Sequence, residues 1–360
     1  MDRGFIYVNS KNLIHNLNAI EKNVNKKLCL VVKANAYGHG ISWAVNTAIK
    51  CNIDWFAVAS LSEAIEVRNI SKSVNILLLS EPSETEIEKV VVNNIDLTVY
   101  NQAFINKLVE SGSKINVHLK IDTGMHRIGC EPQDFYNIYN LIYNSDLNLR
   151  GICTHFPTAD NNIEFTQEAL EKFKNTIREV DTSELVIHVD NSASSFYNFD
   201  QLFNLSRIGI AAYGIPITAK KIELELLPTM EIKTRISNIQ KRKIGEAVSY
   251  GHAHMLERDS IIATAPIGYA DGYPWNSFPD GKVIISNSFC KLIGRVTMDQ
   301  ILIDVTDIDA KINDEVVILG KSENKSISIE VLDIATWNKT IPWEILTNMS
   351  KRLERVEVEY

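Results

Sequence analysis

Eight short apolar runs divide the first two-thirds of the chain at regular intervals. They are rich in valine, isoleucine and leucine and lie at residues 28–32, 55–58, 76–79, 97–100, 117–121, 149–153, 185–189 and 208–212. Such runs are typical of strands that are buried on both faces. Longer amphipathic segments separate them; residues 12–24, for example, place Leu13 and Leu17 on one helical face. Eight strands that alternate with helices predict a (β/α)8 TIM barrel.

A doubly wound sheet is the structural alternative, but it more often carries a glycine-rich turn after its first strand. This chain has no Gly-Gly dipeptide and no G-x-G-x-x-G. Beyond about residue 220, strand-like runs follow one another without long helices, at 230–236, 261–265, 283–285, 292–296, 301–305 and 316–319. We therefore predict a barrel domain at 9–220 and a mainly β domain at 221–360, which also takes an N-terminal strand from residues 1–8.

Composition limits the possible partners of this 360-residue chain. Its 37 basic and 45 acidic side chains give a net charge of −8, which argues against a broad nucleic-acid surface. No run approaches the ~18–20 apolar residues of a membrane span, and no secretory signal is seen at the start. The five cysteines form no C-x-x-C pair, which indicates reduced thiols and no zinc site. We expect a cytoplasmic protein that binds no nucleic acid, membrane or metal.

Polar residues stand at the ends of several predicted barrel strands, where barrel enzymes build their active sites. They are Lys33, Lys120 with Arg127 beyond it, His155, the run Asp190-Asn191-Ser192, and Arg207 with Gly209 and Ile210 after it. Each also has a structural interpretation: a strand-end lysine can extend into solvent, and a lone histidine can be a hydrogen-bonded core residue. Their convergence on one end of the barrel favours a site.

Lys33 is the most informative of these residues, because it directly follows a buried strand. Burial near other cations lowers the pKa of a lysine, and the free amine can then form a Schiff base with an aldehyde. Asn35, Tyr37 and the glycines at 38 and 40 follow it closely and supply polar groups and a permissive backbone.

The segment VVKANAYGHG around Lys33 resembles the cofactor-lysine motif of the alanine racemase family. The resemblance continues in order through HLKIDTGMHRIG at 118–129, THF at 154–156, NSAS at 191–194, RIGIAAYG at 207–214, VSYG at 248–251, IGYADG at 267–272 and GRVTMDQ at 294–300. It implies a fold-type III enzyme that uses pyridoxal 5′-phosphate (PLP). It also implies a homodimer with shared active sites, which supplies D-alanine for bacterial peptidoglycan.

The resemblance assigns the catalytic roles. Lys33 would hold the cofactor and act as the base on one face of the substrate, and Tyr250 of the partner subunit would be the base on the other face. His155 and Arg207 would lie near this tyrosine. A cation at Arg207 facing the pyridine nitrogen would disfavour its protonation, limit carbanion stabilisation and favour rapid reprotonation.

The resemblance also assigns the binding roles. The cofactor contacts would come from Tyr37, Asn191, Ser192, Gly209 and Ile210, the substrate contacts from Arg127, the Met298 N–H and Tyr269, and a carbamate would form on Lys120. A bidentate arginine suits a substrate carboxylate. A carbamate would turn a second cation near Arg127 into an anion.

Two positions depart from the common family pattern. Thr297 stands where many members have cysteine, and Lys351 stands where many have a tyrosine that touches the phosphate and the substrate side chain. Lys351 could pair with phosphate, and loss of the aromatic wall could admit a hydroxymethyl group. The ending RLERV also resembles the racemase domains of vancomycin-resistance serine racemases.

Alanine is therefore the first substrate expected, and serine, or both amino acids, the second. A non-catalytic PLP-homeostasis barrel is a further alternative, although such proteins lack a β domain and a residue like Tyr250. A barrel decarboxylase is disfavoured by the missing Gly-Gly, and a pure interaction protein leaves the polar strand ends unexplained.

Overall fold

The computed structural model describes residues 3–197, 199, 203–218 and 223–360, and its contacts divide the chain into two units. The barrel unit comprises Asn12–Ala36 and Ile41–Leu227. The β unit comprises the chain up to Lys11, the short segment Tyr37–Gly40 and Pro228–Tyr360. The domain boundary predicted between residues 220 and 221 lies outside the described residues.

Within the described residues, the barrel unit is built on an eight-stranded parallel sheet in the order β8-β7-β6-β5-β4-β3-β2-β9. Its strands are β2 (Lys27–Val31), β3 (Trp55–Val58), β4 (Asn75–Leu78), β5 (Asp96–Val99), β6 (Asn116–Lys120), β7 (Asn148–Cys153), β8 (Val186–His188) and β9 (Leu205–Ile208). The Asn204 N–H donates to the Ile187 carbonyl, 3.1 Å away, between the last two strands. This parallel barrel, followed by a mainly β unit, confirms the predicted fold class.

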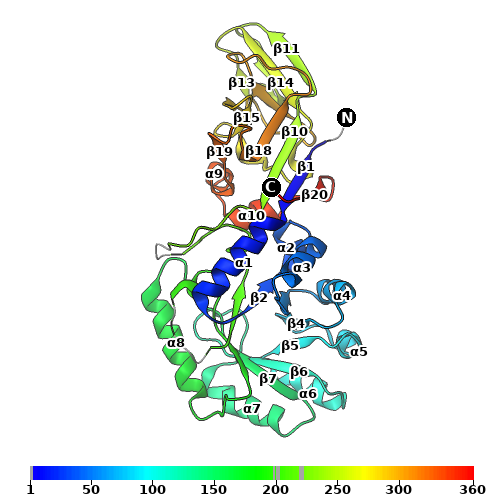
Figure 1. The fold of residues 1–360 in the computed structure, drawn as a ribbon, viewed down its shortest axis with the longest axis vertical. Helices are drawn as coiled ribbons and strands as arrows, with labels where there is room; N and C mark the ends of the chain where they lie inside the picture. The colour runs from blue at the N-terminus through cyan, green and yellow to red at the C-terminus, as the bar shows by residue number, and fades with distance from the viewer. Residues whose placement is uncertain (1–2, 198, 200–202, 219–222) are drawn as a thin grey trace. The chain divides into compact units, whose positions relative to one another are not determined.

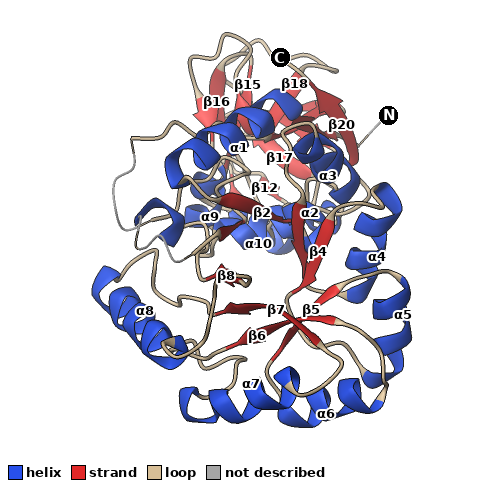
Figure 2. Cartoon of the chain, turned by 60° about the horizontal axis from the view of Figure 1, so that its bottom comes forward, coloured by secondary structure: helices blue, strands red, loops and turns tan. Residues whose placement is uncertain are grey.

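Helices surround the strands on the outside of the barrel unit (Figure 2). They are α1 (Ser10–Val24), α3 (Ile41–Ile49), α4 (Leu61–Ile70), α5 (Ile87–Val92), α6 (Gln102–Glu110), α7 (Phe135–Tyr143) and α8 (Ile163–Ile177). In α1, Leu13, Leu17 and Ile20 are buried along one face, as the helical spacing predicted. The strands between the helices bury side chains on both faces, which explains their continuous apolar sequences.

The eighth strand lies earlier in the sequence than predicted. We expected it at 208–212, but β9 ends at Ile208, and residues 209–214 form turns such as Ala212 N–H to the Gly209 carbonyl at 2.9 Å. These turn residues are apolar because they are buried, not because they pair as a strand. The apolar pattern did not predict β9 because Ser206 and Arg207 interrupt it. Both polar side chains are buried and have hydrogen-bond partners.

The β unit contains three sheets in the described part of the chain (Figure 1). The largest has the order β16-β15-β18-β10-β1-β20, and β1 (Phe5–Asn9) runs parallel to β20 (Glu354–Val358) and antiparallel to β10 (Met230–Arg235). The other strands are β11 (Asn238–Arg242), β12 (Ala247–Val248), β13 (His254–Met255), β14 (Ser260–Ala265), β15 (Lys282–Ile285), β16 (Ser288–Lys291), β17 (Ile301–Asp304), β18 (Glu315–Lys321) and β19 (Ser328–Ile329). Two helices, α9 (Val331–Trp337) and α10 (Pro342–Thr347), precede the last strand.

The strand predicted at 292–296 is wrong. Leu292 forms only an isolated bridge with Ile303, and the chain then turns at Gly294. Gly294 has φ +70°, and a Cβ there would lie 2.4 Å from the Cβ of Ser249. A left-handed residue in close contact with a neighbouring loop cannot continue a strand.

Candidate active site

The segment after β2 turns with an unusual backbone, labelled α2 (Lys33–Tyr37). Four consecutive non-glycine residues, Ala34 to Tyr37, have φ between +52° and +55°. L-residues disfavour this left-handed conformation, so the surrounding contacts must stabilise it. Glu63 at the start of α4 accepts a hydrogen bond from the Ala34 N–H at 2.6 Å, and Asn35 Oδ1 accepts one from the Ile41 N–H at 2.9 Å. These contacts hold the backbone that follows Lys33.

Lys33 is half-buried, and its pKa lies below the ordinary lysine value. Burial is the main cause and the positive charge of Arg127 lowers the pKa further; Glu63 opposes the shift, and Arg207 adds the smallest contribution. The amine is therefore easier to deprotonate than a surface lysine, which is the property required of a Schiff-base lysine and a proton acceptor.

Arg207 is a buried cation in β9, surrounded by neutral acceptors. Its Nη1 donates to His188 Nδ1 at 2.6 Å and to the His188 carbonyl at 2.7 Å. Its Nη2 donates to the Thr154 carbonyl at 2.8 Å and lies 3.3 Å from His155 Nδ1. Burial lowers the pKa of the guanidinium. Among its hydrogen-bond partners in the described chain none is a carboxylate, so its charge acts on the neighbouring groups.

His155 follows β7 and is kept neutral by this surrounding. Its pKa lies well below the ordinary histidine value, first because of burial and then because of the nearby cations Arg207, Lys120, Arg127 and Lys33. The structure thus brings together His155 and the basic residues predicted at the barrel strand ends. Since arginine can only donate, His155 Nδ1 accepts from Arg207 and the ring proton lies on Nε2.

A buried polar chain, which the sequence analysis missed, extends from Arg207 through the barrel. His188 Nε2 lies 2.8 Å from His118 Nδ1, and His118 Nε2 lies 3.3 Å from Asp96 Oδ2. Arg150 Nη1 donates to the same Asp96 oxygen at 2.7 Å. Because Arg207 donates to His188 Nδ1, the His188 proton lies on Nε2 and is donated to His118 Nδ1. The His118 proton then lies on its own Nε2 and is donated to Asp96. The chain therefore has one consistent direction of donation.

The residues expected to hold a phosphate lie after β8 and β9. The Ser192 hydroxyl accepts from the Gly209 N–H at 2.9 Å and from the Ala211 N–H at 3.4 Å. The Asn191 side chain is held by a hydrogen bond to the Phe156 carbonyl at 3.1 Å. Ser192 keeps its own proton for donation, so hydroxyl and backbone donors converge here. Tyr37 is buried, which raises the pKa of its hydroxyl, and it belongs to the β unit.

Lys120 is the last residue of β6, and Arg127 lies in the loop that follows it. Lys120 is buried, and its Nζ donates to the Ile128 carbonyl at 2.7 Å. Burial lowers its pKa, and the cations Arg207 and Arg127 contribute to the same shift. Asp122 Oδ1 accepts from the N–H groups of Gly124 and His126 and shapes the loop that carries Arg127.

Tyr250 in the β unit is presented outward on a strained loop. Its side chain is 73% exposed, and Ser249, Gly251 and His252 beside it have φ of +67°, +68° and +48°. The Ser249 hydroxyl donates to the Arg295 carbonyl at 3.0 Å and ties this loop to the next motif. An aromatic residue left open to solvent in one chain is suited to contact a second chain.

Tyr269 and Met298 lie on two loops that hydrogen-bond to each other. The Tyr269 N–H donates to the Thr297 carbonyl at 3.1 Å, and the Ala270 N–H donates to the Met298 carbonyl at 3.0 Å. The Thr297 hydroxyl donates to the Gln300 carbonyl at 2.9 Å, so the residue that replaces the usual cysteine keeps a polar contact. Lys351 is exposed on a turn after α10.

Two family profiles match in succession and cover most of the chain. Residues 8–216 match the alanine racemase N-terminal domain, and residues 229–357 match the alanine racemase C-terminal domain. The chain belongs to the alanine racemase family. This confirms the resemblance to alanine racemases, a family that depends on PLP.

Relatives of this alanine racemase family member align over almost their whole length. An alanine racemase from Treponema denticola is 36% identical over 97% of this chain and 96% of its own, and alanine racemase 1 from Clostridium acetobutylicum is 34% identical over 97% and 93%. The alanine racemase structure from Clostridium difficile 630 is 34% identical with a TM-score of 0.92, over 100% of this chain and 96% of its own. A histidine racemase from Leuconostoc mesenteroides is 26% identical with a TM-score of 0.90, over 99% and 98%.

Two further observations concern the described residues alone. None of their helices is both long and apolar enough to cross a bilayer. No group of three or more histidine, cysteine, aspartate or glutamate side chains among them is arranged to hold a metal ion.

Proposed function

We propose that this protein is a PLP-dependent racemase that interconverts L- and D-alanine by a two-base mechanism. The observation that carries the proposal is the half-buried Lys33, whose lowered pKa results from burial and from Arg127 and Arg207. A covalent cofactor lysine that must also exchange a proton needs such a shift. The product would serve bacterial peptidoglycan, and the five free cysteines suit a reducing cytoplasm.

The residues at the barrel mouth fit PLP. Lys33 supplies the amine for its aldehyde, and the donors around Asn191, Ser192, Gly209 and Ile210 suit its phosphate. The family pattern adds Tyr37 and Lys351 of the β unit as further phosphate partners. Arg207 suits a pyridine nitrogen that stays unprotonated, because a buried guanidinium can only donate and its present acceptors are neutral. When bound, PLP supplies the electron sink that makes the substrate Cα–H acidic.

The proton moves between the substrate Cα and one base on each face. Lys33 Nζ takes or returns the proton on one face, and Tyr250 Oη of the partner subunit does so on the other. The 73% exposure of Tyr250 supports a role in a second chain, and therefore a homodimer with shared sites. Arg207 provides the positive charge that favours an ionised phenol, and the neutral His155 beside it keeps an Nε2–H group that can donate a hydrogen bond. This makes racemisation a transfer between two positioned groups and not an exchange with solvent.

Substrate binding would rest on the carboxylate. Arg127 provides a bidentate donor, the Met298 N–H a second one, and Tyr269 lines the approach. Lys120 is a buried amine whose pKa is lowered in part by Arg127, and a lowered pKa favours the neutral form in which an amine reacts with carbon dioxide. A carbamate on Lys120 would place an anion next to Arg127 and orient it.

The decisive experiment combines a chiral assay with peptide mapping. Purified protein is incubated with L-alanine and, separately, with D-alanine, and both enantiomers are quantified over time. A second sample is reduced with borohydride, digested and weighed to locate the pyridoxyl group. Conversion in both directions and a label on Lys33 are expected. A labelled protein that racemises nothing as a dimer would instead favour the PLP-homeostasis alternative, and a label elsewhere would remove the basis of the mechanism.

A further inference from the structure

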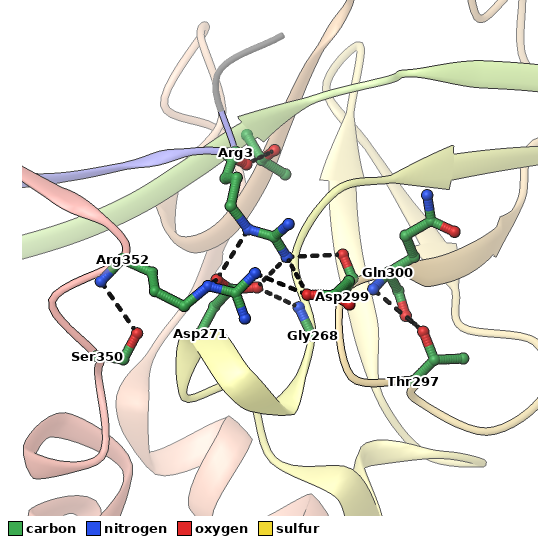
Figure 3. A network of polar contacts seen from close by, with 9 residues as sticks. Arg3, Gly268, Asp271, Thr297, Asp299, Gln300, Ser350 and Arg352 are labelled. Atoms are coloured by element: carbon green, nitrogen blue, oxygen red, sulfur yellow. Dashed lines mark hydrogen bonds and ion pairs between the residues drawn. The ribbon is translucent and has the colours of Figure 1, made fainter.

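Three predicted site residues of the β unit share one structural feature. Tyr269 lies two residues before Asp271, Met298 lies directly before Asp299, and Lys351 lies directly before Arg352. Asp271, Asp299 and Arg352, together with Arg3, form one network of ion pairs, which we name the aspartate–arginine clamp (Figure 3). None of its four members is among the site residues predicted from the sequence motifs.

Asp271 is the buried centre of the clamp. Its side chain is 0% exposed, and it accepts from Arg3 Nε at 3.0 Å and Arg3 Nη2 at 2.8 Å in a bidentate pair. It also accepts from the Gly268 N–H at 2.9 Å, and Arg352 Nε lies 3.3 Å away. A buried carboxylate is tolerated only when such donors surround it.

Asp299 extends the clamp to the loop of Met298. Arg3 Nη2 donates to the Asp299 carbonyl at 3.0 Å and to its side chain at 3.1 Å, and Arg352 Nη2 donates to the same carboxylate at 2.7 Å. The contact with Arg352 and the charge of Arg3 lower the pKa of Asp299. Both arginines therefore bridge the same two aspartates.

The clamp fixes three loops by their backbones as well as by side chains. The Ser350 N–H donates to the Asp271 carbonyl at 3.0 Å, and the Arg352 N–H donates to the Ser350 hydroxyl at 3.2 Å. The first bond ties the Lys351 turn to the Tyr269 loop. The Tyr269 loop is in turn bonded to residues 297 and 298.

The residues that the clamp supports are themselves exposed. Met298 is 53% and Tyr269 is 44% exposed, and Lys351 is exposed as well. Exposed groups have little packing of their own to define their positions, so the rigid network behind them sets the spacing between them.

We propose that Arg3, Asp271 and Arg352 are positioning residues for substrate recognition. Through Asp299 and the connected loops they hold the Met298 N–H, the Tyr269 ring and the Lys351 ammonium at a fixed spacing. This inference rests on the proposed racemase function and assigns to the N-terminal segment, through Arg3, a part in binding the substrate carboxylate. Misplacing a binding group by a small distance weakens recognition far more than it changes the fold.

The test compares kinetic constants of holoenzyme variants. Arg3→Lys keeps the charge but loses the bidentate fork, and we expect the KM for L-alanine to rise about tenfold with kcat within about twofold. The competitive inhibition constant of propionate, which has the carboxylate and methyl group of alanine but no amine, should rise in parallel. The visible absorbance of bound PLP should be unchanged, because Lys33 is untouched.

A matched control exists in the same unit. Arg258 also bridges two aspartates, with Nη1 and Nη2 donating to Asp307 at 2.9 and 2.6 Å and Nη2 lying 3.3 Å from Asp304. No predicted site residue is adjacent to Arg258, Asp304 or Asp307 in the sequence. Arg258→Lys should leave the KM for alanine and the inhibition constant of propionate within about twofold of the wild type.

A second clamp variant provides the test if Arg3→Lys fails to fold. Asp299→Asn changes a half-exposed group and keeps hydrogen-bonding capacity, and it should raise the KM about threefold. An unchanged KM in folded Arg3→Lys and Asp299→Asn, or an equal rise in Arg258→Lys, overturns the positioning role. If the wild type itself racemises no alanine, the proposed function fails first and the inference fails with it.

Discussion

The barrel mouth and the aspartate–arginine clamp of the β unit hold arginines in opposite electrostatic surroundings. Arg207 is buried among histidine nitrogens and carbonyl groups. Arg3 is paired with two carboxylates. A cation without a contacting anion keeps its field and shifts the pKa values of its neighbours, whereas a paired cation loses its field and serves as a rigid connection.

This difference in surroundings separates the barrel residues proposed to act in proton transfer from the β-unit residues proposed to recognise the substrate. Lys33, the base proposed in the barrel unit, and His155 lie near the unpaired cations, and both have lowered pKa values. The groups proposed to recognise substrate from the β unit lie beside the paired ones. If the comparison is right, barrel variants should change kcat, cofactor attachment or pH dependence, and clamp variants should change KM.

The largest effect is expected at Lys33. Lys33→Ala should lower kcat at least about 10⁴-fold and abolish the visible absorbance of lysine-bound PLP, because both the covalent link and one base are lost. Chiral turnover and absorbance spectra measure this. Lys27→Ala, at the exposed start of β2, the strand that precedes Lys33, is the control and should retain both properties. A wild-type kcat in Lys33→Ala would refute the proposed mechanism.

Tyr250→Phe should reduce kcat by about 10² to 10⁴-fold while PLP stays attached, because only the proton carrier is removed. Steady-state rates and absorbance spectra separate the two properties. Tyr143→Phe is the matched control, since that tyrosine is 71% exposed in the barrel unit. Unaltered kcat in Tyr250→Phe would show that the second base is another group.

Stability should depend on pH through the buried histidines. The pKa of His188 lies well below its ordinary value because of burial and the charge of Arg207. In the unfolded chain this histidine has a pKa of about 6.5, whereas in the folded protein it takes up a proton only at lower pH. The free energy of unfolding is therefore at its full value above about pH 6.5 and falls as the pH decreases toward the folded pKa.

His188→Gln should therefore flatten this dependence, by up to roughly 1.4 kcal/mol per pH unit below pH 6.5. Urea unfolding between neutral and mildly acidic pH measures the slope. His15→Gln, at an exposed histidine, should leave the slope as in the wild type. A steep slope that persists in His188→Gln would contradict the assigned neutral state.

The smallest effect concerns substrate choice. Lys351→Tyr should reduce serine turnover about fivefold more than alanine turnover, because an aromatic wall would exclude a hydroxymethyl group at a cost of about 1 kcal/mol. Chiral assays of both amino acids provide the ratio. Lys291→Tyr, at an exposed lysine of β16, is the control. If serine is no substrate of the wild type, the alternative of a serine or dual racemase is refuted.

The barrel could be predicted from the sequence because each of its strands is marked by a short run of neighbouring apolar residues. Buried parallel strands require continuous apolar runs, and seven of the eight expected runs coincide with strands to within about a residue or two. The eighth was displaced because Ser206 and Arg207 interrupt its apolar character. Motif order also predicts a site at the barrel mouth, since the carboxyl ends of parallel strands share one edge, and His155 and Arg207 do lie in contact.

The tertiary structure alone decided how the polar groups pair. His118, His188 and Asp96 each stand in or beside a buried strand, a signal that each needs a partner, but nothing local indicates that they bond to one another. Arg3 and Asp271 are separated by 268 positions and meet only because the folded β unit brings their segments together. Strand character follows from neighbouring side chains, whereas ion pairs and proton order depend on distances that the whole fold sets.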